Sequence, residues 1–171
     1  MATNPIVRMG VCNVRYGTLE LGHTKGGVKL SYKVESEAVE TDQSDAPVDV
    51  VITKQPVEVT VPMVEGQLEK LASLIPGSTL IVDETDPSKK RLEISGAAGG
   101  SLAAGAQPLV LTPVNGNEND IVTLYHAACL PEFDLSFEKG TNIHIYNLRF
   151  QALRGANGYV AFGDPSVIQG A

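Results

Sequence analysis

The sequence contains no tryptophan, and only 5% of its 171 residues are aromatic. A hydrophobic core must therefore be built mainly from Val, Leu, Ile and Ala, and the aromatic platforms common in sugar-binding modules are not expected. No apolar run approaches the length of a membrane helix, and polar residues interrupt the first fifteen positions, so we expect neither membrane insertion nor a signal peptide. Cys12 and Cys129 are too few for a disulfide framework, and we expect reduced, buried thiols in a protein made in the cytoplasm.

Basic residues are also scarce, because 13 Lys and Arg stand against 20 Asp and Glu, giving a formal charge of −7. Such a surface repels phosphates, so tight sequence-independent binding of nucleic acid is not expected. The charge is uneven: residues 35–69 hold nine acids and one base, Lys54. The acidic stretch 35–49 lacks the ordered spacing of an EF-hand loop. It is therefore either a solvated loop or a wall that repels a polyanion.

Basic residues cluster only at Lys89, Lys90 and Arg91, where a predicted hairpin returns. Two interpretations stay open for this cluster. It is either a solubilising turn or a socket for an acidic patch on a neighbouring copy.

Period-two alternation of apolar and polar residues dominates the chain and predicts strands with one buried face. The clearest runs begin at Val28 and Val57 and extend over residues 28–34 and 57–63. Further strands are predicted over 11–16 and 18–21 (a hairpin about Gly17), 48–52, 78–82, 90–95, 109–114, 121–130, 141–153 and 158–162. In 141–153 the buried face switches, which predicts a bulge near Tyr146 and Asn147.

Helical spacing of apolar residues occurs over 64–75, and Pro76-Gly77 is expected to end that helix. The fold class is therefore mostly β, with two packed antiparallel sheets as a sandwich or curved barrel, one flanking α-helix and extended loops in a single domain. Long alternating strands leave free sheet edges, which a monomer must cover or an oligomer must pair.

None of the motifs that suggest catalysis or a cofactor has the surrounding sequence that such a site needs. Ser101 lies in a Gly-Gly-Ser-Leu-Ala sequence resembling a hydrolase nucleophile elbow, but a Gly- and Ala-rich loop replaces the strand–turn–helix setting that the elbow needs. The Gly-rich segment 22–27 lacks the ending of a phosphate-binding loop. His23, His126 and His144 share no metal-ligand spacing. We therefore expect no enzyme activity, no catalytic residue, no cofactor and no metal.

The order of elements carries a resemblance over nearly the whole chain. A small hairpin, residues 10–21, leads through 22–27 into the long strand from Val28 and the acidic Glu40-Thr41-Asp42-Gln43 segment. Asp45-Ala46-Pro47-Val48-Asp49 begins the return strand, and the helix, the late strands and a short C-terminal arm follow. In this layout the chain resembles a tail tube protein, the major tail protein of a long-tailed bacteriophage.

The resemblance implies a structural virion protein of the tail, assembled in the host cytoplasm. Copies would form hexameric rings that stack into a hollow tube, through which DNA leaves without being bound. The implied partners are the chain itself and other tail proteins, such as the tape measure, the terminator and baseplate or tip components. Alternatives are a tail terminator, a head decoration protein and, less favoured, a monomeric β-sandwich binding module.

Three groups of residues follow from this hypothesis. Residues 36–47 are the predicted inter-ring assembly loop, and residues 1–9 and 155–171 are predicted arms. The loop residues most directly implicated are Glu40, Thr41, Asp42, Gln43, Ser44 and Asp45. The acids predicted to face the lumen are Glu35, Glu37, Asp49, Glu58 and Glu138.

Overall fold

The computed structural model describes residues 10–140, 143–168 and 170. The predicted N-terminal arm 1–9 and the start of the predicted strand 141–153 lie outside this part of the chain. In order along the chain, its elements are β1 (Cys12–Tyr16), β2 (Leu19–Glu20), β3 (Lys29–Tyr32), β4 (Glu35–Val39), β5 (Asp49–Lys54), β6 (Val57–Met63), α1 (Leu68–Leu74), β7 (Ser78–Val82), β8 (Lys90–Ile94), the 3-10 turn η1 (Leu102–Gly105), β9 (Gln107–Pro113), the 3-10 turn η2 (Glu118–Asp120), β10 (Val122–Glu132), β11 (Tyr146–Ala152) and β12 (Val160–Phe162).

The body of the molecule is an antiparallel sheet with the strand order β2-β1-β9-β10-β11-β6-β3, and β12 also pairs with β10. β10 connects the two halves of this sheet, because its first part pairs with β9 and its second part with β11. A register shift between Leu124 and Ala127 marks the change. The predicted mostly-β, antiparallel fold with one helix is confirmed, and its two packed layers are parts of one continuous curved sheet.

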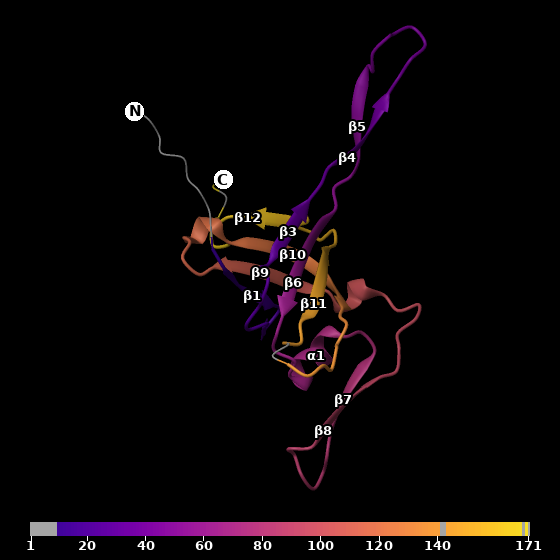
Figure 1. Cartoon of the computed structure of the whole chain (residues 1–171). Helices are drawn as coiled ribbons and strands as arrows, with labels where there is room; N and C mark the ends of the chain where they lie inside the picture. The colour runs from indigo at the N-terminus through magenta and orange to yellow at the C-terminus, as the bar shows by residue number, and fades with distance from the viewer. Residues whose placement is uncertain (1–9, 141–142, 169, 171) are drawn as a thin grey trace.

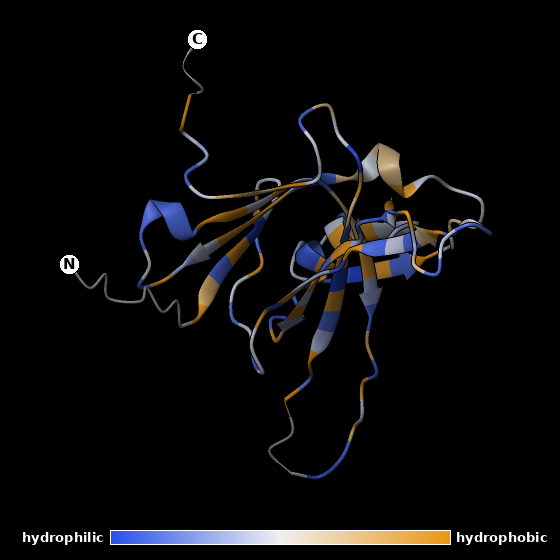
Figure 2. Ribbon diagram, turned by 90° about the horizontal axis from the view of Figure 1, so that it is seen from above, coloured by the Kyte–Doolittle hydropathy of each residue, from blue (hydrophilic) through white to orange (hydrophobic). Residues whose placement is uncertain are grey.

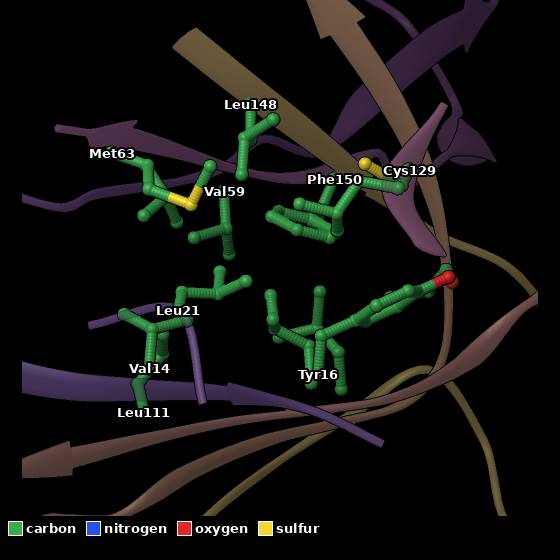
Figure 3. Packing of buried hydrophobic residues seen from close by; sticks show 14 of the residues in the cluster. Val14, Tyr16, Leu21, Val59, Met63, Leu111, Cys129, Leu148 and Phe150 are labelled. Carbon is green, nitrogen blue, oxygen red and sulfur yellow. The ribbon is translucent and has the colours of Figure 1, made fainter. Parts of the chain in front are cut away.

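Alternating burial along facing strands builds the core. Val59, Val61 and Phe150 point inward from β6 and β11, and all three are fully buried. Figure 3 shows this layer packing against Val14, Tyr16, Leu21 and Leu111 of the opposite layer. The same alternation of hydrophobic and hydrophilic residues is visible along the strands in Figure 2.

Tyr16 joins the two layers of the core. Its ring contacts that of Phe150, with centroids 5.0 Å apart, and its hydroxyl donates a hydrogen bond to the carbonyl oxygen of Ala127 at 2.9 Å. The polar end of this buried side chain is therefore satisfied. Gly17 follows at φ +61°, which permits the tight β1–β2 turn predicted from the sequence.

Two expectations about local structure are wrong in detail. The helix spans only Leu68–Leu74, since the Val64 amide donates to the carbonyl oxygen of His23 at 3.0 Å and remains tied to the sheet end. The predicted bulge near Tyr146 and Asn147 is absent, because β11 begins at Tyr146 and pairs in regular register with both neighbours. The apparent switch of face arose because Ile143 and Ile145 precede the strand and do not belong to it.

Two separate two-stranded sheets, β4–β5 and β7–β8, project from opposite ends of the body (Figure 1). The β7–β8 hairpin is anchored near α1, whose Leu71 and Leu74 are buried in the core. Within the described residues, no helix is both long and apolar enough to cross a lipid bilayer.

Core packing around Phe150 is open to a direct test. Phe150→Ala is expected to lower the free energy of unfolding by about 3–5 kcal/mol, because the fully buried ring leaves a cavity between the layers. Phe137→Ala is the matched control, since that ring is 85% exposed, and it should change stability by less than about 0.5 kcal/mol. Chemical denaturation measures both, and equal losses would contradict the packing described.

Candidate assembly surfaces

The β4–β5 hairpin extends the β3–β6 pair beyond the body of the sheet (Figure 1). The Lys33 amide donates to the carbonyl oxygen of Pro56 at 3.2 Å, so the two pairs form one long ribbon. The inner half, β3–β6, is attached to β11 through β6, whereas β4–β5 is a sheet of only two strands.

Ten of the eleven strand residues in β4–β5 are exposed, and only Glu35 is half-buried. The apolar side chains on this hairpin are 41–59% exposed: Val39, Val48, Val50, Val51 and Ile52. An isolated two-stranded hairpin is marginally stable in water, and open strand edges with exposed valines are prone to pair with other chains. The hairpin is therefore the surface of this chain that a partner would stabilise most clearly, by burying its valines and pairing its open edges.

The register of the hairpin divides its side chains between two faces. Glu37 lies opposite Val51, and Val39 lies opposite Asp49, so Glu37 and Asp49 are diagonal neighbours on one face. Each face thus carries exposed apolar groups, while the acids concentrate on one of them. The structure brings these two of the five predicted lumen acids together.

The other three predicted lumen acids lie elsewhere. Glu35 is at the base of β4, with its carboxylate 3.6 Å from the Lys33 ammonium. Glu58 is on β6 within the body, opposite Ser31 and Gln151. Glu138 is exposed in the segment between β10 and β11. The five acids therefore do not form one continuous patch on a single copy.

The predicted assembly loop 36–47 is shorter than expected, because residues 36–39 belong to β4. The actual loop is the hairpin tip, residues 40–48, closed by a hydrogen bond from the Val48 amide to the Val39 carbonyl oxygen at 2.9 Å. Within it, the Ser44 hydroxyl donates to the carbonyl oxygen of Ala46 at 2.7 Å. The six predicted loop residues all lie in this tip and are all exposed: Glu40, Thr41, Asp42, Gln43, Ser44 and Asp45.

The predicted C-terminal arm 155–171 is also shorter in the structure. Val160–Phe162 forms β12 and pairs with β10 opposite residues 122–124, so this part belongs to the sheet. Beyond it, Val167 and Ile168 are 73% and 91% exposed. Of the described residues that follow β12, residues 165–168 and 170 are the exposed ones.

The three basic residues at 89–91 form ion pairs with acids of their own chain. The Lys89 ammonium lies 3.6 Å from Asp86, Lys90 pairs with Glu69, and the Arg91 guanidinium lies 2.9 Å from Glu93. The hydrogen bond from Lys90 lowers the pKa of the Glu69 carboxyl and keeps it charged. These pairs favour the solubilising-turn interpretation over a socket for another copy.

A second set of cations, which the sequence patterns did not single out, lies on the outward face of the main sheet. Lys29, Thr60 and Arg149 lie side by side on β3, β6 and β11. All three are exposed, because the alternate residues on these strands fill the core. Lys25 follows at the end of β6, where its amide donates to the carbonyl oxygen of Pro62 at 3.0 Å. We call Lys25, Lys29 and Arg149, with Thr60 and Pro62 as the floor between them, the cationic groove.

The residues considered for catalysis or metal binding remain apart. Ser101 is exposed in a loop before η1, which is a four-residue 3-10 turn and not the α-helix of a nucleophile elbow. The ring nitrogens of His126 and His144 each contact a backbone carbonyl oxygen, of Ala103 and Ser136. Among the residues that the structure describes, no group of three or more potential metal ligands comes together.

The two thiols are not bonded to each other, and they differ in burial. Cys129 is buried on β10, where desolvation raises the pKa of its thiol to about 12. Cys12 is half-buried on β1, and burial raises its thiol pKa as well. Neither environment stabilises a thiolate nucleophile.

A hollow of about 610 Å³ lies between the outward face of the sheet and the segment before β11. Among the described residues, Phe133 is the one Phe, Tyr or Trp that lines it, and its ring meets the ring of Tyr146 edge-on, with centroids 5.0 Å apart. These residues form no stacked aromatic platform for a sugar.

A scan against protein-family models finds no match for this chain. A search of curated proteins finds no significant match either.

Proposed function

We propose that this chain is a structural virion protein whose copies form hexameric rings, stacked into the hollow tube of a phage tail. The observation that carries the proposal is the β4–β5 hairpin, a ribbon of exposed valines and open strand edges that no other described part of the chain covers. Burying this ribbon between copies removes apolar surface from water and pairs its edges. The layout of elements along the chain supports the tail-tube assignment in particular.

The main sheet supports a ring in a similar way. Its strand path ends at β3 on one side and β2 on the other, so it is open at two different edges. Joining one edge to the other edge of a neighbouring copy closes the strands of several copies into a barrel. A contact between two different surfaces is heterologous, and such contacts produce closed rings or open filaments.

The acidic excess suits a conduit for DNA. Of the five proposed lumen acids, Glu37 and Asp49 are supported best, because they share one face of the projecting hairpin. A wall of carboxylates holds no array of cations that could exchange counterions with phosphates, so DNA passes without being held. In this proposal the protein acts in the virion tail, after assembly in the host cytoplasm. Its further partners are the tape measure, the terminator and baseplate or tip proteins.

The second candidate is another virion part, a tail terminator or a head decoration protein. The same exposed hairpin favours self-association in these proteins, so assembly form separates them from a tube subunit. A monomeric binding module is supported less, because it leaves the hairpin without a partner and the 610 Å³ hollow offers no aromatic platform.

The tube proposal is tested by replacing residues 40–47 with Asn-Gly. This two-residue turn keeps the bond between Val48 and Val39 and so preserves the hairpin strands. We expect unchanged chemical stability but loss of stacked tubes, read by size exclusion and negative-stain microscopy over a concentration series. The wild type should give hollow tubes or stacked rings.

The matched control makes the same replacement at residues 84–88 of the β7–β8 hairpin, where Asp83 and Lys89 are already hydrogen bonded. This variant should still form tubes. Normal tubes from the 40–47 variant would contradict the assembly role of the tip. A wild type that stays monomeric at every concentration would refute the tube, and rings that never stack would favour the terminator.

The lumen assignment is tested separately in phage particles that carry Glu37→Lys and Asp49→Lys. The new cations should slow DNA ejection, and more so at low ionic strength, because they attract phosphates inside the tube. The control is Glu84→Lys with Glu93→Lys, the same charge change on the other hairpin. Ejection at the wild-type rate from the first variant would sink the lumen assignment.

A further inference from the structure

The cationic groove is a firmly built surface of the described structure. Lys25 and Lys29, with Gly26 and Gly27 between them and Pro62 below, line an open hollow of about 390 Å³. Gly26 and Gly27 have φ values of +104° and +85°, a backbone conformation that side chains would strain. The two glycines therefore leave the middle of the turn without side chains, and Lys25 and Lys29 lie on either side of it.

Backbone hydrogen bonds hold this turn on the end of β6. The Lys25 amide donates to Pro62, and the Val64 amide donates to His23 at 3.0 Å. The carboxylate of Glu65 accepts a hydrogen bond from the His23 amide at 2.8 Å and pairs with Lys70. Lys70 and the His23 amide both lower the pKa of the Glu65 carboxyl, so this anchor stays charged in mildly acidic solution.

The cations of the groove have no ion-pair partner among the described residues. The ion pairs there involve other Lys and Arg residues and His23, and none includes Lys25, Lys29 or Arg149. The same face also carries Glu58, one row from Thr60 on β6, and Glu132, opposite Asn147. Charge at the groove itself is therefore positive, with acids at its border.

The hairpin tip carries the opposite charge. Residues 40–48 contain three acids and no base, and the tip also presents the exposed side chain of Val48. Half-buried Ile145 provides apolar surface in the groove to match it. The two surfaces are therefore complementary in charge and in apolar character.

The tip cannot reach the groove of its own copy. Both lie on the same ribbon, the groove where β3 begins and β6 ends and the tip beyond β4 and β5 (Figure 1). Eleven residues separate Lys29 from Glu40, and at roughly 3.3 Å per residue this places them about 35 Å apart. A second copy must supply one of the two surfaces.

The geometry points to the cationic groove as the receptor for the hairpin tip of a second copy of this chain, with Lys25, Lys29 and Arg149 facing Glu40, Asp42 and Asp45. This inference rests on the proposed self-assembly and names the receiving surface. Because tip and groove lie at opposite ends of one ribbon, repeating the contact moves each copy along the ribbon axis and builds an open stack.

Charge reversal on each surface tests the contact. K25E/K29E reverses the groove, E40K/D42K/D45K reverses the tip, and each variant alone then brings like charges together. We expect the concentration needed for assembly to rise at least about tenfold in each variant. Sedimentation velocity measures this rise in the concentration needed for assembly. The control is K139E/R154E, which makes the same charge change as K25E/K29E. Both control sites are exposed and have no ion pair in the described residues, so this variant should assemble normally.

Mixing the two reversed variants restores opposite charges at every contact between one variant and the other. The acidic tip of one variant meets the unchanged groove of the other, and the basic tip meets the reversed groove. Association that returns only on mixing, and that weakens with added salt, supports the docking. Assembly of K25E/K29E alone at the wild-type concentration, or no association on mixing, would overturn it.

The same experiments separate this inference from the proposed function. If the tube is right and the groove is not the receptor, the wild type and K25E/K29E form the same tubes. If the groove is the receptor and the tube is wrong, the mixed variants associate but microscopy shows chains without rings.

Discussion

The outer half of one two-stranded ribbon is not covered by any other described part of its chain, and this constraint explains how the rest of the described structure is arranged. The inner half, β3–β6, is attached to β11 and packs on the core through Val59 and its neighbours. The outer half, β4–β5, continues the same backbone into water with its valines exposed. Folding of the body therefore fixes the direction of the hairpin, and its own stability depends on what it meets.

The charged side chains also divide into those that are paired within the chain and those that are not. The cations of the β7–β8 turn are paired with acids of their own chain, whereas those of the cationic groove have no such partner in the part of the chain that the structure describes. The acids of the hairpin tip are likewise concentrated where no base is near in the sequence. Apolar exposure thus makes association favourable, while the arrangement of charges selects which surfaces meet.

Sequence patterns were sufficient wherever a strand has one buried and one exposed face. The predicted strand 57–63 has the bounds of β6, and its four alternating apolar residues are buried, although Pro62 is buried as well. The hairpin about Gly17 is present as predicted. The same alternation over residues 28–34 predicted a buried face, yet Tyr32 and Val34 are exposed because the ribbon leaves the body there. Periodicity reports which side chains share a face, but it cannot report whether another layer covers that face.

The cationic groove could not be found from the sequence for a related reason. Lys25 lies in a glycine-rich turn, Lys29 is on the polar side of a strand pattern, and Arg149 is more than a hundred residues away. Strand register alone brings Lys29 and Arg149 to the two sides of Thr60. The acidic tip was visible as a run of charge, because its residues are neighbours in the chain.

Hydrogen exchange of the backbone amides in residues 35–54, compared between dilute and assembled protein, tests the central claim most directly. In dilute protein these amides should exchange far faster than those of β6 and β11, because the hairpin opens without disturbing the core. Assembly should then protect them, while β6 and β11 change little. Hairpin amides as protected as β6 in the dilute protein, or still unprotected after assembly, would contradict the claim that this ribbon finds its partner in another copy.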